Sequence, residues 1–249
     1  DVLVTPDAVV PLKILVKDNL AIRRIELVYS RSDKSDEGEK IVVLYEGPET
    51  LPPVEGISLH SAELGESRVV EHGWNLAELG LAPGTRLAVG ARATDYLPQT
   101  GQTPSPRIIT VIAPDELQDR LADRQVYILS ELTRALAIER EVRGQTSAVE
   151  IRLGEVGTLE RQDIDLVQAT ELNQRQADRL LTSRDDGIPR HVEQLLADLA
   201  SNKIDSPDIV RRMEGLLAEL GRLGREHLPA IRRELTAAVK TAQAESSAH

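Results

Sequence analysis

The sequence contains no cysteine and no phenylalanine, and aromatic residues make up only 2% of its 249 positions. The absence of cysteine excludes disulfide bonds and thiolate metal sites, but it does not select a cellular compartment. With one tryptophan and four tyrosines, any core must be built mainly from Leu, Val, Ile and Ala. These residues suit both β-branched strands and helix seams.

Positive charge is also scarce. The chain has 30 Lys and Arg against 41 Asp and Glu, which gives a formal net charge of −11. The basic residues are interleaved with acidic ones instead of forming a block. A phosphate backbone is repelled by such a surface, and we therefore expect no nucleic-acid binding.

Long apolar runs are missing as well. No stretch approaches the ~18 apolar residues that a membrane-spanning helix needs, and no signal peptide is recognisable. The chain starts at Asp1 without an initiator methionine. We expect it to be either processed or excised from a longer protein. We favour the second interpretation, because a domain that ends on a long open helical arm resembles a fragment, and any membrane anchor would then lie in segments outside it.

Proline is distributed unevenly along the chain. Ten of the 13 prolines fall within the first 114 residues, together with Trp74 and three of the four tyrosines. This change in composition places a boundary near Ala113–Pro114. We predict two domains, residues 1–113 and residues 114–249.

Residues 1–113 have the pattern of an all-β domain, with short β-branched runs separated by turn signals. In one run, Leu12, Ile14 and Val16 share one face while Lys13 and Lys17 share the other. A Pro- and Gly-containing excursion spans residues 47–67. The predicted strands are Val2–Thr5, Val9–Lys17, Ile22–Ser30, Glu39–Tyr45, Arg68–Asn75, Thr85–Asp95 and Arg107–Ala113.

Two segments of this part resemble known β-sandwich motifs. Residues 16–27 (VKDNLAIRRIEL) are similar to a hairpin of bacterial immunoglobulin-like repeats, in which an aspartate and a turn precede I-x-x-V/I. Residues 79–95 (LGLAPGTRLAVGARATD) look like the L-x-P-G … A-x-A-x-D entry into the penultimate strand of immunoglobulin-like and fibronectin type III domains. The resemblance implies a sandwich over about residues 1–113 and no particular activity. Leu87 or Val89 replaces the tyrosine often found on that strand, so no tyrosine corner is expected.

Residues 114–249 are predicted to be helical. Pro114 and the two acids that follow it are typical of a helix start. The first helix should run to about Leu153, and others should span about 161–183, 189–201 and 207–243, with Pro229 interrupting the last. Apolar residues recur every seven positions in the first helix, forming a column of Leu121, Ile128, Ala135, Val142, Val149 and Val156.

The companion positions of this column are mostly polar, at Arg124, Glu131, Gln145 and Arg152. A two-stranded coiled coil needs both sets to be apolar, so the column is expected to pack against other helices. The second predicted helix is rich in amides, which either fix register in an interface or lie on the solvated side. The predicted interaction surface consists of Leu121, Ile128, Val142, Val149, Gln174 and Gln176.

Four aspartates are candidates for calcium ligands. Asp33 and Asp36 lie in an acidic loop whose spacing does not match an EF-hand, and a solvated hairpin loop explains them equally well. Asp18 and Asp95 resemble aspartates that hold calcium between repeats in some related modules. Both follow predicted strands, where an aspartate more commonly bonds its own turn. We favour the structural roles and expect no cofactor.

No catalytic constellation stands out. The five histidines are scattered without an H-x-x-x-H pair, and the chain has neither a Gly-rich phosphate loop nor a nucleophile elbow. Trp74 either stacks on a sugar or, as is usual for a lone tryptophan on a sandwich strand, fills the core. We expect no enzymatic activity and no small-molecule substrate.

The sequence thus predicts an α+β protein with segregated domains: an all-β immunoglobulin-like sandwich, then an all-α bundle or long helical hairpin. This combination resembles the extracytoplasmic parts of large, membrane-anchored bacterial envelope proteins. The resemblance implies a periplasmic or otherwise extracytoplasmic scaffold. Its sandwich would act as spacer or docking module, and its helices would bind a protein partner or a second copy. The alternative is a sandwich that binds a glycan or a peptide through residues 47–67.

Overall fold

The computed structural model describes residues 2–19, 21–50 and 66–247. Most of the excursion at 47–67, with His60, and the C-terminal His249 lie outside the described residues. The chain divides into two compact units, one of Asp1–Asp119 with Ala200–Ile204 and one of Arg120–Leu199 with Asp205–His249. The strands come first and the long helices follow, which confirms the predicted order of a β-rich part and a helical part.

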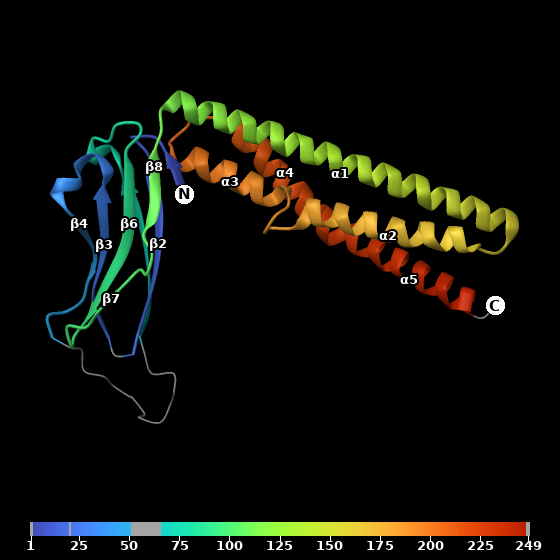
Figure 1. The fold of residues 1–249 in the computed structure, drawn as a ribbon, viewed down its shortest axis with the longest axis horizontal. Coiled ribbons are helices and arrows are strands. Elements are labelled where there is room, and N and C mark those ends of the chain that lie inside the picture. Colours follow the sequence, from blue (N-terminus) through green and yellow to red (C-terminus); the bar gives the residue numbers. More distant parts are fainter. Residues whose placement is uncertain (1, 20, 51–65, 248–249) are drawn as a thin grey trace. The chain divides into compact units, whose positions relative to one another are not determined.

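Two sheets form the first unit (Figure 1). The larger has the strand order β1-β8-β6-β3-β4, with β7 paired to β6, and the smaller pairs β2 with β5. β1 runs parallel to β8, and the other pairs are antiparallel. The strands are β1 (Val2–Val4), β2 (Val9–Asp18), β3 (Ile22–Arg31), β4 (Lys40–Glu46), β5 (Glu66–Asn75), β6 (Arg86–Asp95), β7 (Thr100–Gln102) and β8 (Arg107–Val111).

The hydrophobic core of this unit includes Val10 of β2 and Trp74 of β5, which lie opposite each other in the smaller sheet. Alternation along the strands points Leu27, Tyr29 and Leu87 between the sheets, where each is 5% exposed or less. Trp74 lies against Tyr29 with ring centroids 4.9 Å apart. The core role favoured for Trp74 is therefore confirmed, and its ring is not accessible to a sugar.

The first unit also takes in the turn at residues 200–204. Asn202 accepts hydrogen bonds through Oδ1 from the Thr5 N–H at 2.7 Å and from the Thr5 hydroxyl at 3.2 Å. Both residues are buried. This pair joins positions 197 residues apart in the chain, and no periodicity in the sequence indicates it.

The second unit is built from helices α1 (Pro114–Val156), α2 (Arg161–Thr182), α3 (Ile188–Ser201), α4 (Pro207–Glu226) and α5 (Leu228–Ser247). α1 runs three residues beyond its predicted end because it continues through Gly154. It stops before Gly157, whose φ of 79° is the left-handed geometry common just after a helix. Side chains of α1 contact both α2 and α3, and α2 packs against α4 and α5.

The helical unit consists of three passes: α1, then α2 with α3, then α4 with α5. The second and the third pass are each interrupted. A turn at Ser183–Gly187 separates α2 from α3, and a side chain at Gly187 would lie only 2.6 Å from the Ser183 carbonyl oxygen. α4 and α5 separate at His227, two residues before Pro229, as the proline predicts. A Cβ added at Gly224 of α4 would lie 3.1 Å from Thr182 of α2. The two interruptions therefore lie at the same level of the helical unit.

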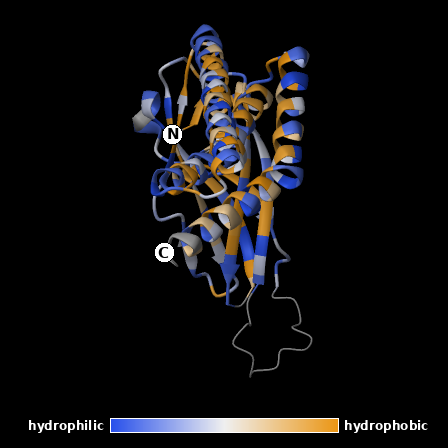
Figure 2. Cartoon of the chain, turned by 90° about the vertical axis from the view of Figure 1, so that its right-hand side faces the viewer, coloured by the Kyte–Doolittle hydropathy of each residue, from blue (hydrophilic) through white to orange (hydrophobic). Residues whose placement is uncertain are grey.

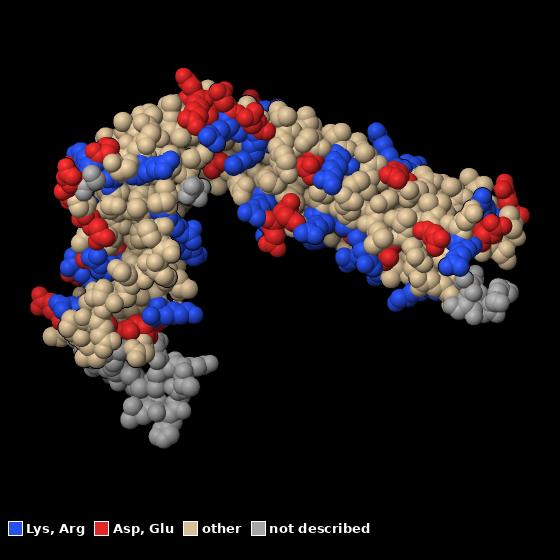
Figure 3. Space-filling view, in the orientation of Figure 1, with Lys and Arg blue, Asp and Glu red and all other residues tan. Residues whose placement is uncertain are grey.

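Charge and hydropathy are mixed over both units. Figure 2 shows hydrophobic and hydrophilic residues alternating along the helices. On the face shown in Figure 3, Lys and Arg are interleaved with Asp and Glu. That face has no continuous basic region of the kind that a nucleic acid requires.

Candidate functional site

The seven-residue column of α1 faces into the helical unit. Leu121, Ile128 and Val142 are 6%, 2% and 5% exposed, and Val149 is half-buried. Only at Val156 does the column become exposed. Leu121, Ile128 and Val142 are covered by other residues of the chain and are therefore not available to a partner. The pattern had identified a face that must be covered, but it does not identify what covers it.

A second apolar face of α1 stays in water. Val126, Leu129, Leu136 and Ile151 are 50–67% exposed. At ~100° per residue, their spacings of three, seven and fifteen positions keep them on one side of the helix. We call these four residues the outer stripe of α1. Leu129 and Leu136 also lie seven residues apart, so a seven-residue spacing marks this second face as well. The column from Leu121 to Val156 is the longer and more evident of the two patterns.

Polar pairs join α1 to α2 at three levels, which we call the polar rungs. They are Arg152–Asp163 (Nη1 to Oδ1, 2.6 Å), Thr170–Gln145 (Oγ1 to Oε1, 2.9 Å) and Gln174–Glu139 (Nε2 to Oε1, 2.8 Å). Seven residues back along α1, from 152 to 145, correspond to seven forward along α2, from 163 to 170. The rungs thus hold the two helices antiparallel in one register.

Gln174 is the buried amide of this set, with 1% of its surface exposed. Its Nε2 also donates to Asp178 Oδ1 at 3.2 Å, while its Oε1 has no hydrogen-bond partner among the described residues. Gln176, which was predicted to belong to the same interaction surface, is exposed. Gln174 therefore acts within the chain, where a buried amide fixes helix register, and Gln176 is the one open to a partner.

Helix packing shifts the pKa of three carboxyl groups in this unit. Burial raises the pKa of Asp178 and of Asp198, although Gln174 and Arg124 respectively oppose the rise. The pKa of Glu171 is lowered, first by the hydrogen bond from the Thr236 hydroxyl at 2.7 Å and then by Arg175. Each shift has a structural cause in the contact between helices.

Asp18 and Asp95, two of the calcium candidates, bond to the backbone beside them. Asp95 Oδ1 accepts from the N–H groups of Leu97 at 2.8 Å and Gln99 at 2.7 Å. Asp18 Oδ1 accepts from the Asn19 N–H at 2.9 Å. Asp95 therefore has the turn role that was favoured for it, whereas Asp18 bonds only to the adjacent N–H, and its Oδ2 is buried without a hydrogen-bond partner among the described residues.

The acidic loop forms a 3₁₀ turn, Ser32–Glu37. Asp33 pairs there with Arg31 at 2.7 Å, and this bond lowers the pKa of Asp33. Asp36 is exposed. Over residues 2–19, 21–50 and 66–247, no group of three or more potential metal-binding side chains converges. The structure does not bring the four calcium candidates together.

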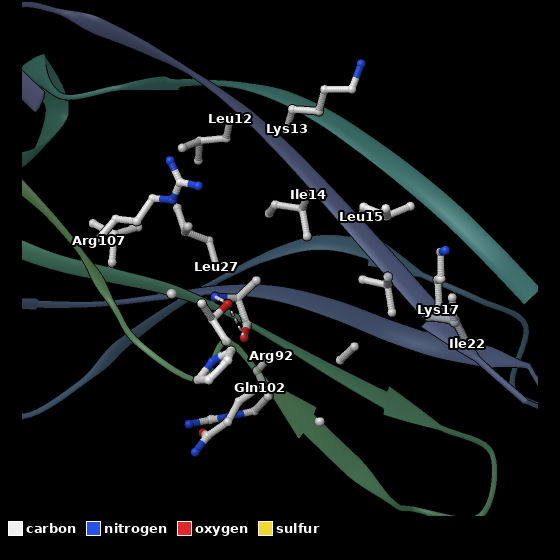
Figure 4. A pocket seen from close by; sticks show the side chains of 18 of the residues that line it. Leu12, Lys13, Ile14, Leu15, Lys17, Ile22, Leu27, Arg92, Gln102 and Arg107 are labelled. Atoms are coloured by element: carbon white, nitrogen blue, oxygen red, sulfur yellow. Dashed lines mark hydrogen bonds between the residues drawn. The ribbon is translucent and has the colours of Figure 1, made fainter. Parts of the chain in front are cut away.

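The first unit contains an open groove between β2 and the opposing strands β6, β7 and β8 (Figure 4). Its volume is about 890 Å³. Ile14 of β2 projects toward the opposite sheet in Figure 4, whereas Lys13 and Lys17 project away from it. Ala91 and Ala93 of β6 line the facing wall. No pattern in the sequence indicates this groove.

The chain matches no protein-family model, and a search of the curated proteins finds no similar sequence. Within the described part of the chain, none of the helices has the length and apolar character needed to cross a bilayer.

Proposed function

We propose that the chain is a non-enzymatic structural and interaction module of a larger extracytoplasmic bacterial protein. The first unit would be an immunoglobulin-like sandwich that serves as spacer or docking domain. The second unit would bind a protein partner or a second copy through its helices. The observation that carries this proposal is the outer stripe of α1.

Strand topology supports the immunoglobulin-like interpretation. If β2, β3, β5, β6 and β8 correspond to strands B, C, E, F and G, then B and E share one sheet while C, F and G share the other. Immunoglobulin domains divide these strands in the same way. One departure is that the core tryptophan, Trp74, lies on β5, whereas antibody domains carry it on strand C; β3, the counterpart of C, supplies Tyr29 instead.

The spacing of the stripe supports an interaction role. Single exposed apolar side chains are ordinary on protein surfaces, but these four recur along one side of a long helix. Burial of one large aliphatic side chain contributes about 1.5–3 kcal/mol. Helices that dock into grooves present apolar anchors at similar three- and seven-residue spacings. A stripe of this kind is suited to contact with another helix.

The test is the solution mass of residues 1–249, measured by size-exclusion chromatography with light scattering over a range of concentrations. We expect concentration-dependent association that the double variant Leu129→Glu, Leu136→Glu abolishes. Its melting temperature should not fall, because both side chains are already at least half exposed. Arg134→Glu is the matched control, since it alters the net charge by the same amount from an exposed position off the stripe.

A monomer at every concentration, with both variants indistinguishable from the unmodified chain, would contradict an interaction role for the stripe. Association that survives the double variant would move the contact to another surface and also count against it.

A further inference from the structure

The outer edge of β2, in the smaller sheet, has no paired strand among the described residues. β2 pairs with β5 along all ten of its residues, from Val9 opposite Asn75 to Asp18 opposite Glu66. Among the described residues, this sheet has no third strand. The other side of β2 therefore carries backbone groups with no strand from the described residues beside them, and we call this side the free edge of β2.

Alternation identifies the groups on the free edge. The Ala8 carbonyl accepts from the Leu76 N–H at 2.9 Å, so even-numbered residues of β2 direct their backbone groups toward β5 and odd-numbered residues direct theirs away. Pro11 falls on the free edge, where a missing N–H breaks no ladder bond. The N–H groups that remain there belong to Val9, at the start of β2, and to Lys13, Leu15 and Lys17 along the groove.

The interior beside the free edge has room for further side chains. Val10 is 6% exposed, but Leu12, Ile14 and Val16 farther along the same inner face are only half-buried. Across from them Ala93, together with Ala91, leaves the groove of about 890 Å³, within the ~300–1,000 Å³ range of binding pockets. A strand added beside β2 would place every second side chain in this groove.

The charged residues on the outer face of β2 indicate which side chains an added strand would carry at its alternate positions, those that do not enter the groove. Lys13 pairs with Glu71 at 3.0 Å, whereas Lys17 makes no ion pair within the described part of the chain. Acidic side chains opposite these lysines would be favourable cross-strand partners. A second copy of β2 would instead set lysine against lysine, as edge lysines commonly do to prevent self-pairing.

We propose that the free edge of β2 accepts an extended strand from a different protein. The strand carries apolar side chains that enter the groove, alternating with acidic side chains that face Lys13 and Lys17. Binding extends the smaller sheet to three strands by β-augmentation. This inference rests on the docking role proposed for the sandwich and does not depend on the outer stripe of α1.

The test uses the full chain and a short capped peptide in which valine alternates with glutamate. Amide hydrogen exchange is followed by NMR. Without peptide, the N–H groups of Leu12, Ile14 and Val16 should already exchange slowly because they bond to β5. The peptide should protect Lys13, Leu15 and Lys17, giving an alternating pattern that binding elsewhere would not produce.

Two variants locate the binding site. Leu15→Pro removes an N–H from the free edge and should weaken peptide binding about tenfold or more, whereas Leu15→Ala should not. Lys17→Glu should weaken binding of the glutamate peptide about threefold and favour a valine–lysine peptide. If Leu15→Pro lowers the melting temperature, Ala93→Leu replaces it, because it fills the groove without touching the edge.

Absence of the alternating protection at saturating peptide would overturn the inference, as would binding unaffected by both Leu15→Pro and Ala93→Leu. If Lys13, Leu15 and Lys17 become protected by self-association without peptide, the occupant is a second copy and the proposed partner is wrong. Any of these results alongside association through the outer stripe removes this inference alone and leaves the proposed role of the helices standing.

Discussion

The two helices that follow α1 bury different chemistry, although both contact it. The buried residues of α3 are all apolar: Ile188, Pro189, Val192, Leu195 and Leu199. Half of the buried residues of α2 are polar: Asp163, Thr170, Glu171 and Gln174. Apolar burial supplies free energy without specifying register, whereas buried hydrogen bonds specify register at small net gain. The difference indicates that α3 stabilises the helical unit and that α2 sets its alignment.

The largest loss of stability is expected from a substitution among the buried apolar residues of α3. Leu195 is fully buried, so Leu195→Ala should lower the free energy of unfolding by about 2–5 kcal/mol through lost burial and a cavity. Leu172→Ala on α2 is the matched control, because Leu172 is 62% exposed and should change stability by less than about 0.5 kcal/mol. Urea unfolding measures both. Equal losses in the two variants would remove the contrast between α3 and α2.

A smaller effect is expected at the buried amide. Gln174→Ala leaves Glu139 without its donor and opens a space, and should cost about 1–2 kcal/mol. Gln174→Leu refills that space and removes an unpaired Oε1, so it should change stability by less than about 1 kcal/mol. Calorimetric melting compares the pair. A large loss in Gln174→Leu would mean that the amide stabilises the fold itself, contrary to the role assigned to α2.

The smallest effect concerns pH. The His191 ring of α3 lies edge-on to Tyr127 of α1, with centroids 4.7 Å apart. Burial, aided by the charges of Arg124 and Arg190, lowers the pKa of His191 below its ordinary value of 6.5. The folded state thus favours the neutral ring, and its contribution to stability, complete above pH 6.5, is lost as pH falls through the folded-state pKa.

Stability should therefore decrease as the pH falls below about 6.5, and His191→Gln should flatten that part of the profile. Unfolding midpoints in urea across a pH series measure this. Tyr127→Phe is the control, because it keeps the aromatic contact and the imidazole. Parallel profiles for His191→Gln and the unmodified chain would rule out this source of pH dependence.

Most secondary structure follows from local patterns in the sequence. Two-residue alternation located β2 and β3, and the proline positions located the start of α4 and its separation from α5. β7 was missed because it has only three residues, TGQ, with little β propensity. The end of α1 was placed too early because one glycine inside a long helix costs only about 1 kcal/mol.

The candidate surfaces were less predictable than the elements that carry them. A seven-residue repeat shows that Leu121, Ile128 and Val142 share a face, but α1 presents two apolar faces, and only tertiary packing decides which is covered. The groove beside β2 arises because Ala91 and Ala93 stand across from Ile14. Strand pairing between distant segments creates that juxtaposition, and spacing along one strand does not reveal it.

The coincident breaks in the helical passes have a mechanical consequence. Where the Ser183–Gly187 turn and His227 interrupt the second and third passes, α1 alone carries an unbroken ladder of backbone hydrogen bonds. At ~1.5 Å per residue its 43 residues form a strut of about 64 Å. Such a unit resists bending least at the level where two of its three helical passes are interrupted. We therefore expect bending to concentrate in α1 between Tyr127 and Glu139, while the segments on either side move as two rigid bodies.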